Sequence, residues 1–164
     1  MAVRVMAICE DTRQQRGKHV NKQSYFEAVG ECVVRCALPV GDYQRPAKVA
    51  VDTKKDIIEL GVDVKADHKR FARECEKVQT LGTQLVILVE NTDGVKCLAD
   101  LETWEESDDS YNKRNVSGKA MRYKGASIAK TCKTMHRLYG VKFGFCHPDD
   151  SGRRILEILD AFGG

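Results

Sequence analysis

Short apolar segments alternate along this chain with segments of helical periodicity, and this alternation limits the possible folds more than any other feature. The pattern predicts strands at residues 3–9, 31–37, 40–43, 49–53, 85–89 and 141–146. It predicts helices at 24–29, 66–81, 126–139 and 150–162. Elements in this order form an α/β fold in which helices flank a central mixed β-sheet. We therefore expect residues 1–164 to form a single domain, with an irregular insert at 91–124 and a closing helix–strand–helix unit at 125–164.

Two of the predicted strands form a β-hairpin that brings acidic residues together. A turn centred on Ala47 places Asp42 directly across from Asp52, and Lys54 points to the same face as Asp52. Two carboxylates at that spacing repel each other when both are ionised, so one binds a proton or a cation lies between them. Oxygen ligands that leave room for water suit Mg²⁺ or Mn²⁺. The hairpin therefore has the outline of a metal-dependent phosphodiesterase site, although surface charges on a solvated hairpin would give the same pattern.

Other polar residues follow the ends of apolar strands. Asp11 and Arg13 come directly after the first predicted strand, and Glu90 ends the strand at 85–89. Arg70 and Phe71 belong to the helix predicted at 66–81. Open α/β sheets carry their ligand sites at the carboxyl ends of their strands, so we expect these residues near the hairpin.

Taken in order, these motifs resemble those of the XPF-type structure-specific DNA endonucleases, a branch of the PD-(D/E)XK nuclease superfamily. The family pattern runs D-x-R-E, G-D-Y, E-R-K, R-[FL]-x-x-Q and an apolar strand ending in I-E. The matching residues here are Asp11 and Arg13, Gly41-Asp42-Tyr43, Asp52-Thr53-Lys54, Arg70-Phe71 and Leu88-Val89-Glu90. The resemblance covers about residues 3–90, and it implies a restriction-endonuclease-like fold.

The resemblance also implies a function: a Mg²⁺- or Mn²⁺-dependent endonuclease that hydrolyses phosphodiester bonds in branched or structured DNA during repair or recombination. Asp42 and Asp52 would hold the metal, and Asp11 and the peptide carbonyl of Thr53 would complete its ligands. Lys54 would position the attacking water. Arg13 and Arg70 would bind DNA phosphates or orient the acids. The family further favours a homodimer, or a partner protein that directs the nuclease to its DNA.

Several positions depart from the family pattern. Gln14 stands in place of the last glutamate of D-x-R-E, Thr53 replaces the arginine of E-R-K, and Glu74 takes the glutamine position. Ile58 stands where the family often has a further aspartate. Replacing the arginine removes a bidentate phosphate contact. A catalytically inactive DNA-binding or regulatory module with the nuclease fold therefore remains an alternative.

Basic residues are concentrated in two parts of the chain. The helix at 66–81 has a basic face that includes Lys69 and Arg73, and the segment 113–137 is basic and includes Lys124. Tyr111 and Tyr123 accompany the second stretch, as in surfaces that bind a phosphate backbone and stack bases. An acidic segment at 102–109 precedes it, so a solvated helix with a flexible loop is an equally good interpretation.

The seven cysteines have scattered spacings, and no C-x-x-C occurs. A structural zinc site would require a second matching pair, so reduced cysteines that fill the core are the better interpretation, and a thiol-rich metal-binding protein is a third alternative. No apolar run is long enough to cross a membrane, and Glu10 and Asp11 interrupt any signal-peptide pattern. We therefore expect a cytoplasmic protein that is not secreted.

Overall fold

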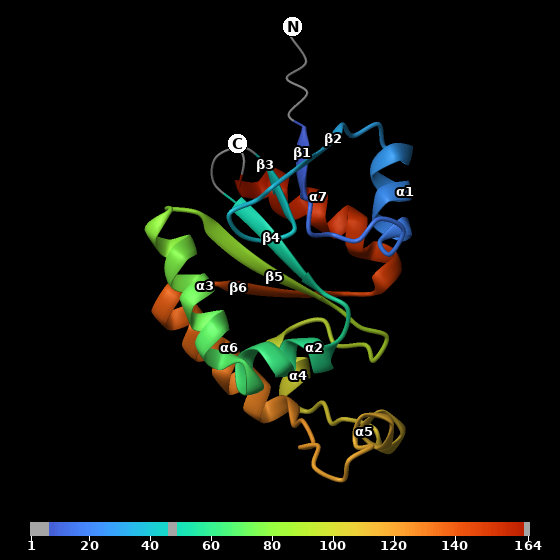
Figure 1. The fold of residues 1–164 in the computed structure, drawn as a ribbon, viewed down its shortest axis with the longest axis vertical. Coiled ribbons are helices and arrows are strands. Elements are labelled where there is room, and N and C mark those ends of the chain that lie inside the picture. The colour runs from blue at the N-terminus through green and yellow to red at the C-terminus, as the bar shows by residue number, and fades with distance from the viewer. Residues whose placement is uncertain (1–6, 46–48, 163–164) are drawn as a thin grey trace, which may run out of the picture.

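The structure, a computed structural model, describes residues 7–45 and 49–162, with the side chain of Phe162 excluded. A six-stranded mixed sheet in the order β2-β1-β3-β4-β5-β6 forms its centre (Figure 1). The strands are β1 (Ile8–Asp11), β2 (Val33–Cys36), β3 (Tyr43–Arg45), β4 (Val49–Lys54), β5 (Gln84–Glu90) and β6 (Lys142–Cys146). β1 pairs with β2 in parallel, as β5 does with β4 and β6, whereas β3 is antiparallel to both its neighbours. The predicted α/β class with a central mixed sheet is confirmed.

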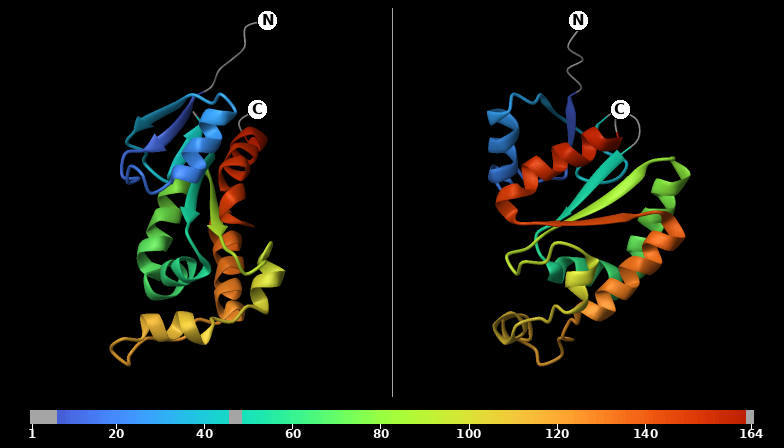
Figure 2. Two further views of the ribbon diagram at one scale, coloured as in Figure 1. Left: turned by 90° about the vertical axis from the view of Figure 1, so that its right-hand side faces the viewer. Right: turned by 180° about the vertical axis from the view of Figure 1, so that it is seen from behind.

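Helices cover both faces of this sheet. They are α1 (Val20–Ala28), α2 (Ile57–Gly61), the π-helical turn η1 (Val62–Ala66), α3 (His68–Thr80), α4 (Leu98–Glu102), α5 (Asp108–Arg114), α6 (Gly125–Tyr139), the 3₁₀ turn η2 (Pro148–Asp150) and α7 (Ser151–Phe162). In Figure 1, α3 and α6 lie side by side, and α1 and α7 cover the other face of the sheet together. Figure 2 shows the same arrangement from the side and from behind.

The core consists of two apolar layers, one on each face of the sheet. Strand side chains alternate between the faces, so Ile87 of β5 enters one layer while Leu88 enters the other. The first layer contains Phe71, Cys75 and Val78 of α3 together with Ile128, Cys132 and Met135 of α6, as the helical spacing predicts. Burying one large apolar side chain stabilises a fold by about 1.5–3 kcal/mol, so these two layers hold the helices against the sheet.

The predicted hairpin has the predicted register. Tyr43 pairs with Val51, and Arg45 pairs with Val49, so the hairpin is centred on residue 47, although residues 46–48 lie outside the described residues. Asp42 directly precedes β3, and its amide donates to the Val51 carbonyl oxygen at 2.8 Å, beside Asp52. The predicted hairpin is thus present, with Asp42 at its start and Asp52 on β4.

Several local predictions are wrong. The first strand continues as far as Asp11, and the part of it predicted at residues 3–6 lies outside the described residues. The segment after β4 forms α2 and η1 before α3 begins, and neither turn was predicted. The insert at 91–124 was expected to be irregular, but it contains α4 and α5, and the Ser107 hydroxyl caps α5. Asp67 does precede α3, but its carboxylate pairs with Arg70 and does not cap the helix.

The cysteines only partly follow the expectation that they fill the core. Cys75, Cys132 and Cys146 are buried, whereas Cys32 and Cys97 are exposed, and all seven are free thiols. Burial raises the pKa of Cys75 to about 12, which keeps this core thiol protonated at neutral pH. Within residues 7–45 and 49–162, no helix is long and apolar enough to span a bilayer.

Candidate active site

The candidate site begins at the bend before β3, where Asp42 enters the sheet. Gly41 has a φ of +73°, and a Cβ there would lie 3.1 Å from the Val51 carbonyl oxygen, so this position favours glycine. The Asp42 amide donates to that same carbonyl oxygen at 2.8 Å. Thr53 then donates twice to Asp42 Oδ2, from its amide at 2.7 Å and from its hydroxyl at 2.8 Å. Thr53, one of the departures from the family motif, thus holds the first carboxylate in place.

Lys54 contacts two carboxylates, that of Asp52 and that of Asp63, and the sequence motifs did not indicate Asp63. Its ammonium nitrogen lies 2.8 Å from Asp52 Oδ2 and 2.5 Å from Asp63 Oδ2. The other oxygen of Asp63 lies 2.8 Å from Arg70 Nη2. Asp63 is only 5% exposed and belongs to η1, a π-helical turn. The family motif places an acid at the position of Ile58, and only the geometry of α2 and η1 shows that the acid beside the lysine comes five residues later.

The charges in this cluster are strongly coupled. Burial and the neighbouring Asp42 together raise the pKa of Asp52 to about 7, although the charge of Lys54 opposes both effects. Burial alone would lower the pKa of Lys54, but Asp52 and Asp63 more than compensate for it, so the lysine stays charged. Burial and Asp52 also raise the pKa of Glu74, which faces the cluster from α3. The site therefore holds a cationic lysine among several acids, and one of those acids titrates near neutral pH.

Asp11 lies next to Asp42, but its carboxylate is turned to a different partner. Its amide donates to the Asp42 carbonyl oxygen at 2.7 Å, so the backbones of the two residues are joined. Its carboxylate, 2% exposed, forms an ion pair with Arg13 and accepts a hydrogen bond from the Arg13 amide. Arg13 thereby lowers the pKa of Asp11, although burial opposes the shift. In the part of the chain that the structure describes, no group of three or more His, Cys, Asp or Glu side chains could by itself hold a metal ion.

The acids open into a cleft of about 410 Å³. One wall consists of Asp42 and residues 52–55. The other wall has Lys18 and His19, which precede α1, and Lys22 of α1. Lys22 forms a buried ion pair with Glu90, whose carboxylate also accepts a hydrogen bond from the Ser151 hydroxyl at 2.7 Å. Glu90 thus anchors the cationic wall, a role that its position at the end of a strand did not reveal.

Gln14 also lines the cleft, and its side-chain oxygen is buried without a hydrogen-bond partner among the described residues. An unpaired buried acceptor is costly unless a water or a ligand satisfies it. Asp42 and Asp52, with this amide oxygen nearby, form a donor set of hard oxygens. Such a set fits a divalent cation like Mg²⁺, which retains several of its waters and needs only one or two protein carboxylates.

The predicted DNA-binding residues are spread over more than one surface. Arg13 lines the cleft, and Arg70 pairs with Asp63 and Asp67 rather than with Glu74. Lys69 and Arg73 are exposed on α3. Lys124 lies outside the cleft, at the start of α6, where it forms a β-bridge with Glu105.

The acidic and basic segments of the sequence largely neutralise each other. Glu106, Asp108 and Glu102 pair with Arg114, Arg122 and Lys133 respectively. Arg122 lies 4.3 Å from the centre of the Tyr111 ring, and Arg114 lies 4.9 Å from that of Tyr123. An arginine therefore already covers one face of each ring.

The structure combines a mixed sheet with helices on both faces, and its β3–β4 hairpin carries Asp42 at its start and Asp52 on its second strand. No protein-family model matches the chain, and no curated protein matches its sequence. Solved structures of XPF from Aeropyrum pernix, one of them a complex with DNA, are similar to this chain with a TM-score of 0.62 and 15% identity. Each similarity covers 94% of this chain, which spans only 60% and 64% of the two XPF chains. The fold is therefore XPF-like, as the motifs predicted.

Proposed function

We propose that this chain is a metal-dependent endonuclease that hydrolyses phosphodiester bonds in branched or structured DNA. The observation that carries the proposal is the pair of facing carboxylates, Asp42 and Asp52, with the charged Lys54 beside them in an open cleft. The XPF-like fold adds support, because one of the similar structures is a complex with DNA.

Asp42 and Asp52 would hold a Mg²⁺ or Mn²⁺ ion together with the Thr53 carbonyl, and Asp11 would contribute through a water because its carboxylate pairs with Arg13. When bound, such a metal lowers the pKa of a coordinated water and neutralises charge on the phosphate.

Side chains around the cleft would orient the attacking water and the DNA. Lys54 keeps its charge and would direct the attacking water, and its ion pair with Asp63 fixes the position of the ammonium group. The side-chain oxygen of Gln14 would accept a hydrogen bond from a water in the cleft. Arg13 and Lys18 line the cleft, are exposed, and would bind phosphates of the strand to be cut. A homodimer or a partner protein that directs the site to its DNA is part of the same proposal.

The decisive experiment is a cleavage assay on labelled single-stranded, duplex, flap, fork and four-way-junction DNA in EDTA, Mg²⁺ and Mn²⁺. We expect metal-dependent cutting by the wild type and none by Asp52→Asn or Lys54→Ala. Lys130→Ala, an exposed lysine on α6 outside the cleft, is the matched control and should cut normally. Retained cleavage in Lys54→Ala would remove the assigned centre.

A catalytically inactive DNA-binding module is the second candidate. Two observations favour an inactive module: the Asp11 carboxylate forms an ion pair with Arg13, and the acids of the described residues do not form a cluster of three metal ligands. Salt-sensitive DNA binding without cleavage in either metal would establish that reading.

A further inference from the structure

Residues 107–123 form a projecting segment, here called the α5 lobe. It consists of α5 and the loop that returns to α6, and the β-bridge between Glu105 and Lys124 closes its base. Both views of Figure 2 show the lobe extending beyond α2 at one end of the molecule. Three of its four basic residues pair with acids: Lys113 with Asp109, Arg114 with Glu106 and Arg122 with Asp108.

The lobe is held rigidly from within. Glu106 at its base has no exposed side-chain surface, and it accepts hydrogen bonds from Arg114 Nε at 2.7 Å and Arg114 Nη2 at 2.6 Å. The Tyr123 amide and the Ser110 hydroxyl donate to the same carboxylate at 3.1 Å each. Because Glu106 accepts hydrogen bonds from both α5 and the end of the returning loop, it joins these two segments at one point. These contacts lower the pKa of Glu106, although burial opposes the shift.

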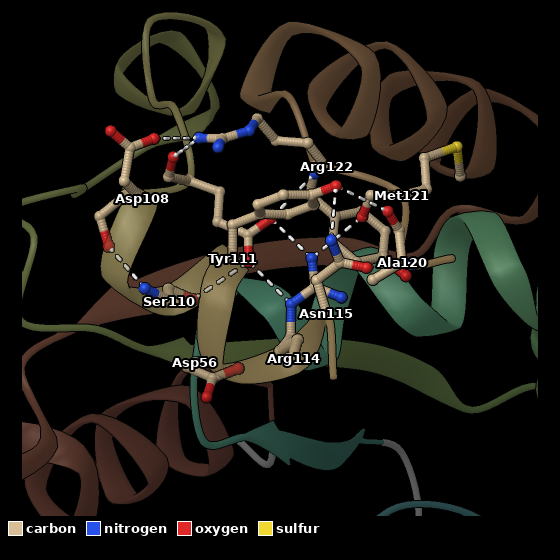
Figure 3. A network of polar contacts seen from close by, with 12 residues as sticks. Asp56, Asp108, Ser110, Tyr111, Arg114, Asn115, Ala120, Met121 and Arg122 are labelled. Carbon is tan, nitrogen blue, oxygen red and sulfur yellow. Dashed lines mark hydrogen bonds and ion pairs between the residues drawn. The ribbon is translucent and has the colours of Figure 1, made fainter. Parts of the chain in front are cut away.

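The return loop is ordered in the same way (Figure 3). The Tyr111 hydroxyl donates to the Ala120 carbonyl at 3.1 Å, and Asn115 Oδ1 accepts from the Ala120 amide at 2.8 Å. Arg114 donates to the Met121 carbonyl at 3.0 Å. The loop at 116–119 is therefore presented on a stiff support.

Two apolar side chains are exposed on this part of the lobe. Val116 is 91% exposed and Met121 is 66% exposed. Lys119 lies between them in the sequence, and no carboxylate among the described residues pairs with it. A specific protein interface buries about 800 Å² on each partner, which two isolated side chains beside a lysine do not provide. Proteins that distort DNA, in contrast, insert a single apolar side chain between base steps and hold the flanking phosphates with basic residues.

The lobe is also continuous with the candidate active site. A groove of about 510 Å³ separates α5 from α2, and Ser110 and Lys113 line it on the side of the lobe. Lys55 and Glu59 line both this groove and the catalytic cleft. The cleft and the groove therefore share part of their lining, so a nucleic acid in the cleft would lie close to the lobe.

We propose that the α5 lobe is a second DNA contact, in which Val116 inserts against the bases of a duplex arm beside the cut and Lys119 binds a phosphate of that arm. The inference rests on the proposed function, because it needs DNA in the cleft. It assigns the preference for structured DNA to a rigid apolar tip and not to the carboxylates.

Fluorescence anisotropy with labelled single-stranded, duplex and flap DNA, measured in EDTA, tests the proposal without relying on catalysis. Val116→Asp should weaken binding of duplex and flap DNA by about tenfold, comparable to the loss of one stacked base, and Val116→Leu should retain it. Lys119→Glu should reduce the magnitude of the negative slope of log K against log salt by about 0.9 for the lost phosphate contact. Single-stranded DNA, which offers no duplex arm to the lobe, should bind all variants equally.

Leu138→Asp is the matched control, because Leu138 is 52% exposed on α6, outside the lobe. Equal duplex affinity of Val116→Asp and the wild type would overturn the lobe contact while leaving the nuclease proposal intact. A wild type that binds no DNA at all would overturn both. If Val116→Asp instead changes the oligomeric state in light scattering and leaves DNA affinity unchanged, the tip is an interface between copies of this chain, and the DNA proposal is wrong.

Discussion

At the scale of single residues, Asp52 is the most unusual group in the site, because it is a nearly buried carboxylate with another acid beside it. Its pKa rises from 3.8 to about 7, so the native protein without metal binds this proton more tightly than the unfolded chain does. Stability should then fall as the pH rises through that interval, because the unfolded state releases the proton first.

Asp52→Asn removes this dependence, and we expect its effect to vary with pH. In EDTA at pH 8 the variant should melt about 2–4 °C above the wild type, which corresponds to about 1 kcal/mol for a chain of this size. The difference should vanish near pH 4, where both forms are neutral. Thermal melts at several pH values measure it, with the exposed Asp67→Asn as the control. A difference independent of pH would contradict the assigned burial.

Asp63 acts on the site through other side chains, because it holds both Lys54 and Arg70. We expect Asp63→Asn to lower kcat by about 10–100-fold, since a misplaced catalytic group is costly even when binding persists. DNA affinity in EDTA should stay within about twofold of the wild type, because the neutral amide removes no phosphate contact. Asp67→Asn, which removes the exposed partner of the same arginine, should leave kcat unchanged. Equal loss in both variants would mean that Asp63 has no special positioning role.

At the scale of elements, the difference between α3 and η1 shows what the sequence could predict. The stripe of Phe71, Cys75 and Val78 has helical spacing, so the helix and its buried face were predictable. The hairpin register was predictable because its two strands are close in sequence and nearly symmetric about residue 47. The π-helical turn has no such signature, so the position of Asp63 beside Lys54 depends on packing between distant segments.

The α5 lobe was missed for a related reason. Its composition is polar, as in a loop, and the helix is stabilised by Glu106, which receives donors from both Arg114 and Tyr123. The pairing of the acidic segment with the basic one also joins residues that lie far apart in sequence. A charge pattern read along the chain therefore overstated the free positive charge of residues 113–137.

The crossing of α4 and α6 provides a prediction at this scale. A Cβ on Gly125 would lie 1.8 Å from the Leu101 carbonyl oxygen and 2.6 Å from that of Trp104. Gly125→Ala should therefore destabilise the protein by about 2–3 kcal/mol, because the backbone on both sides must move. Gly144→Ala is the control, since its nearest neighbour is the flexible end of Leu88 at 3.4 Å. Urea denaturation compares them, and equal midpoints would contradict the close packing.

At the scale of the whole molecule, the metal proposal predicts a change in global stability. Mg²⁺ bound by Asp42 and Asp52 would stabilise the folded state by mass action, and ten times its Kd should raise Tm by about 3–5 °C. Asp42→Asn should lose this increase, whereas Lys130→Ala should keep it. Thermal melts in EDTA and Mg²⁺ measure the effect without any DNA. An equal increase in Asp42→Asn would place the ion elsewhere.

The antiparallel strand β3 joins two parallel units of the sheet, β1 with β2 on one side and β4, β5 and β6 on the other. Asp42 enters at the start of β3, while Asp52 and Lys54 belong to β4. The β3–β4 hairpin therefore brings these groups together, whereas Asp63, which holds Lys54, comes from η1 outside the sheet. A chain in which only this hairpin had formed would have both carboxylates but would lack the contact that holds Lys54 in place, so the complete centre would arise only once η1 has packed beside β4.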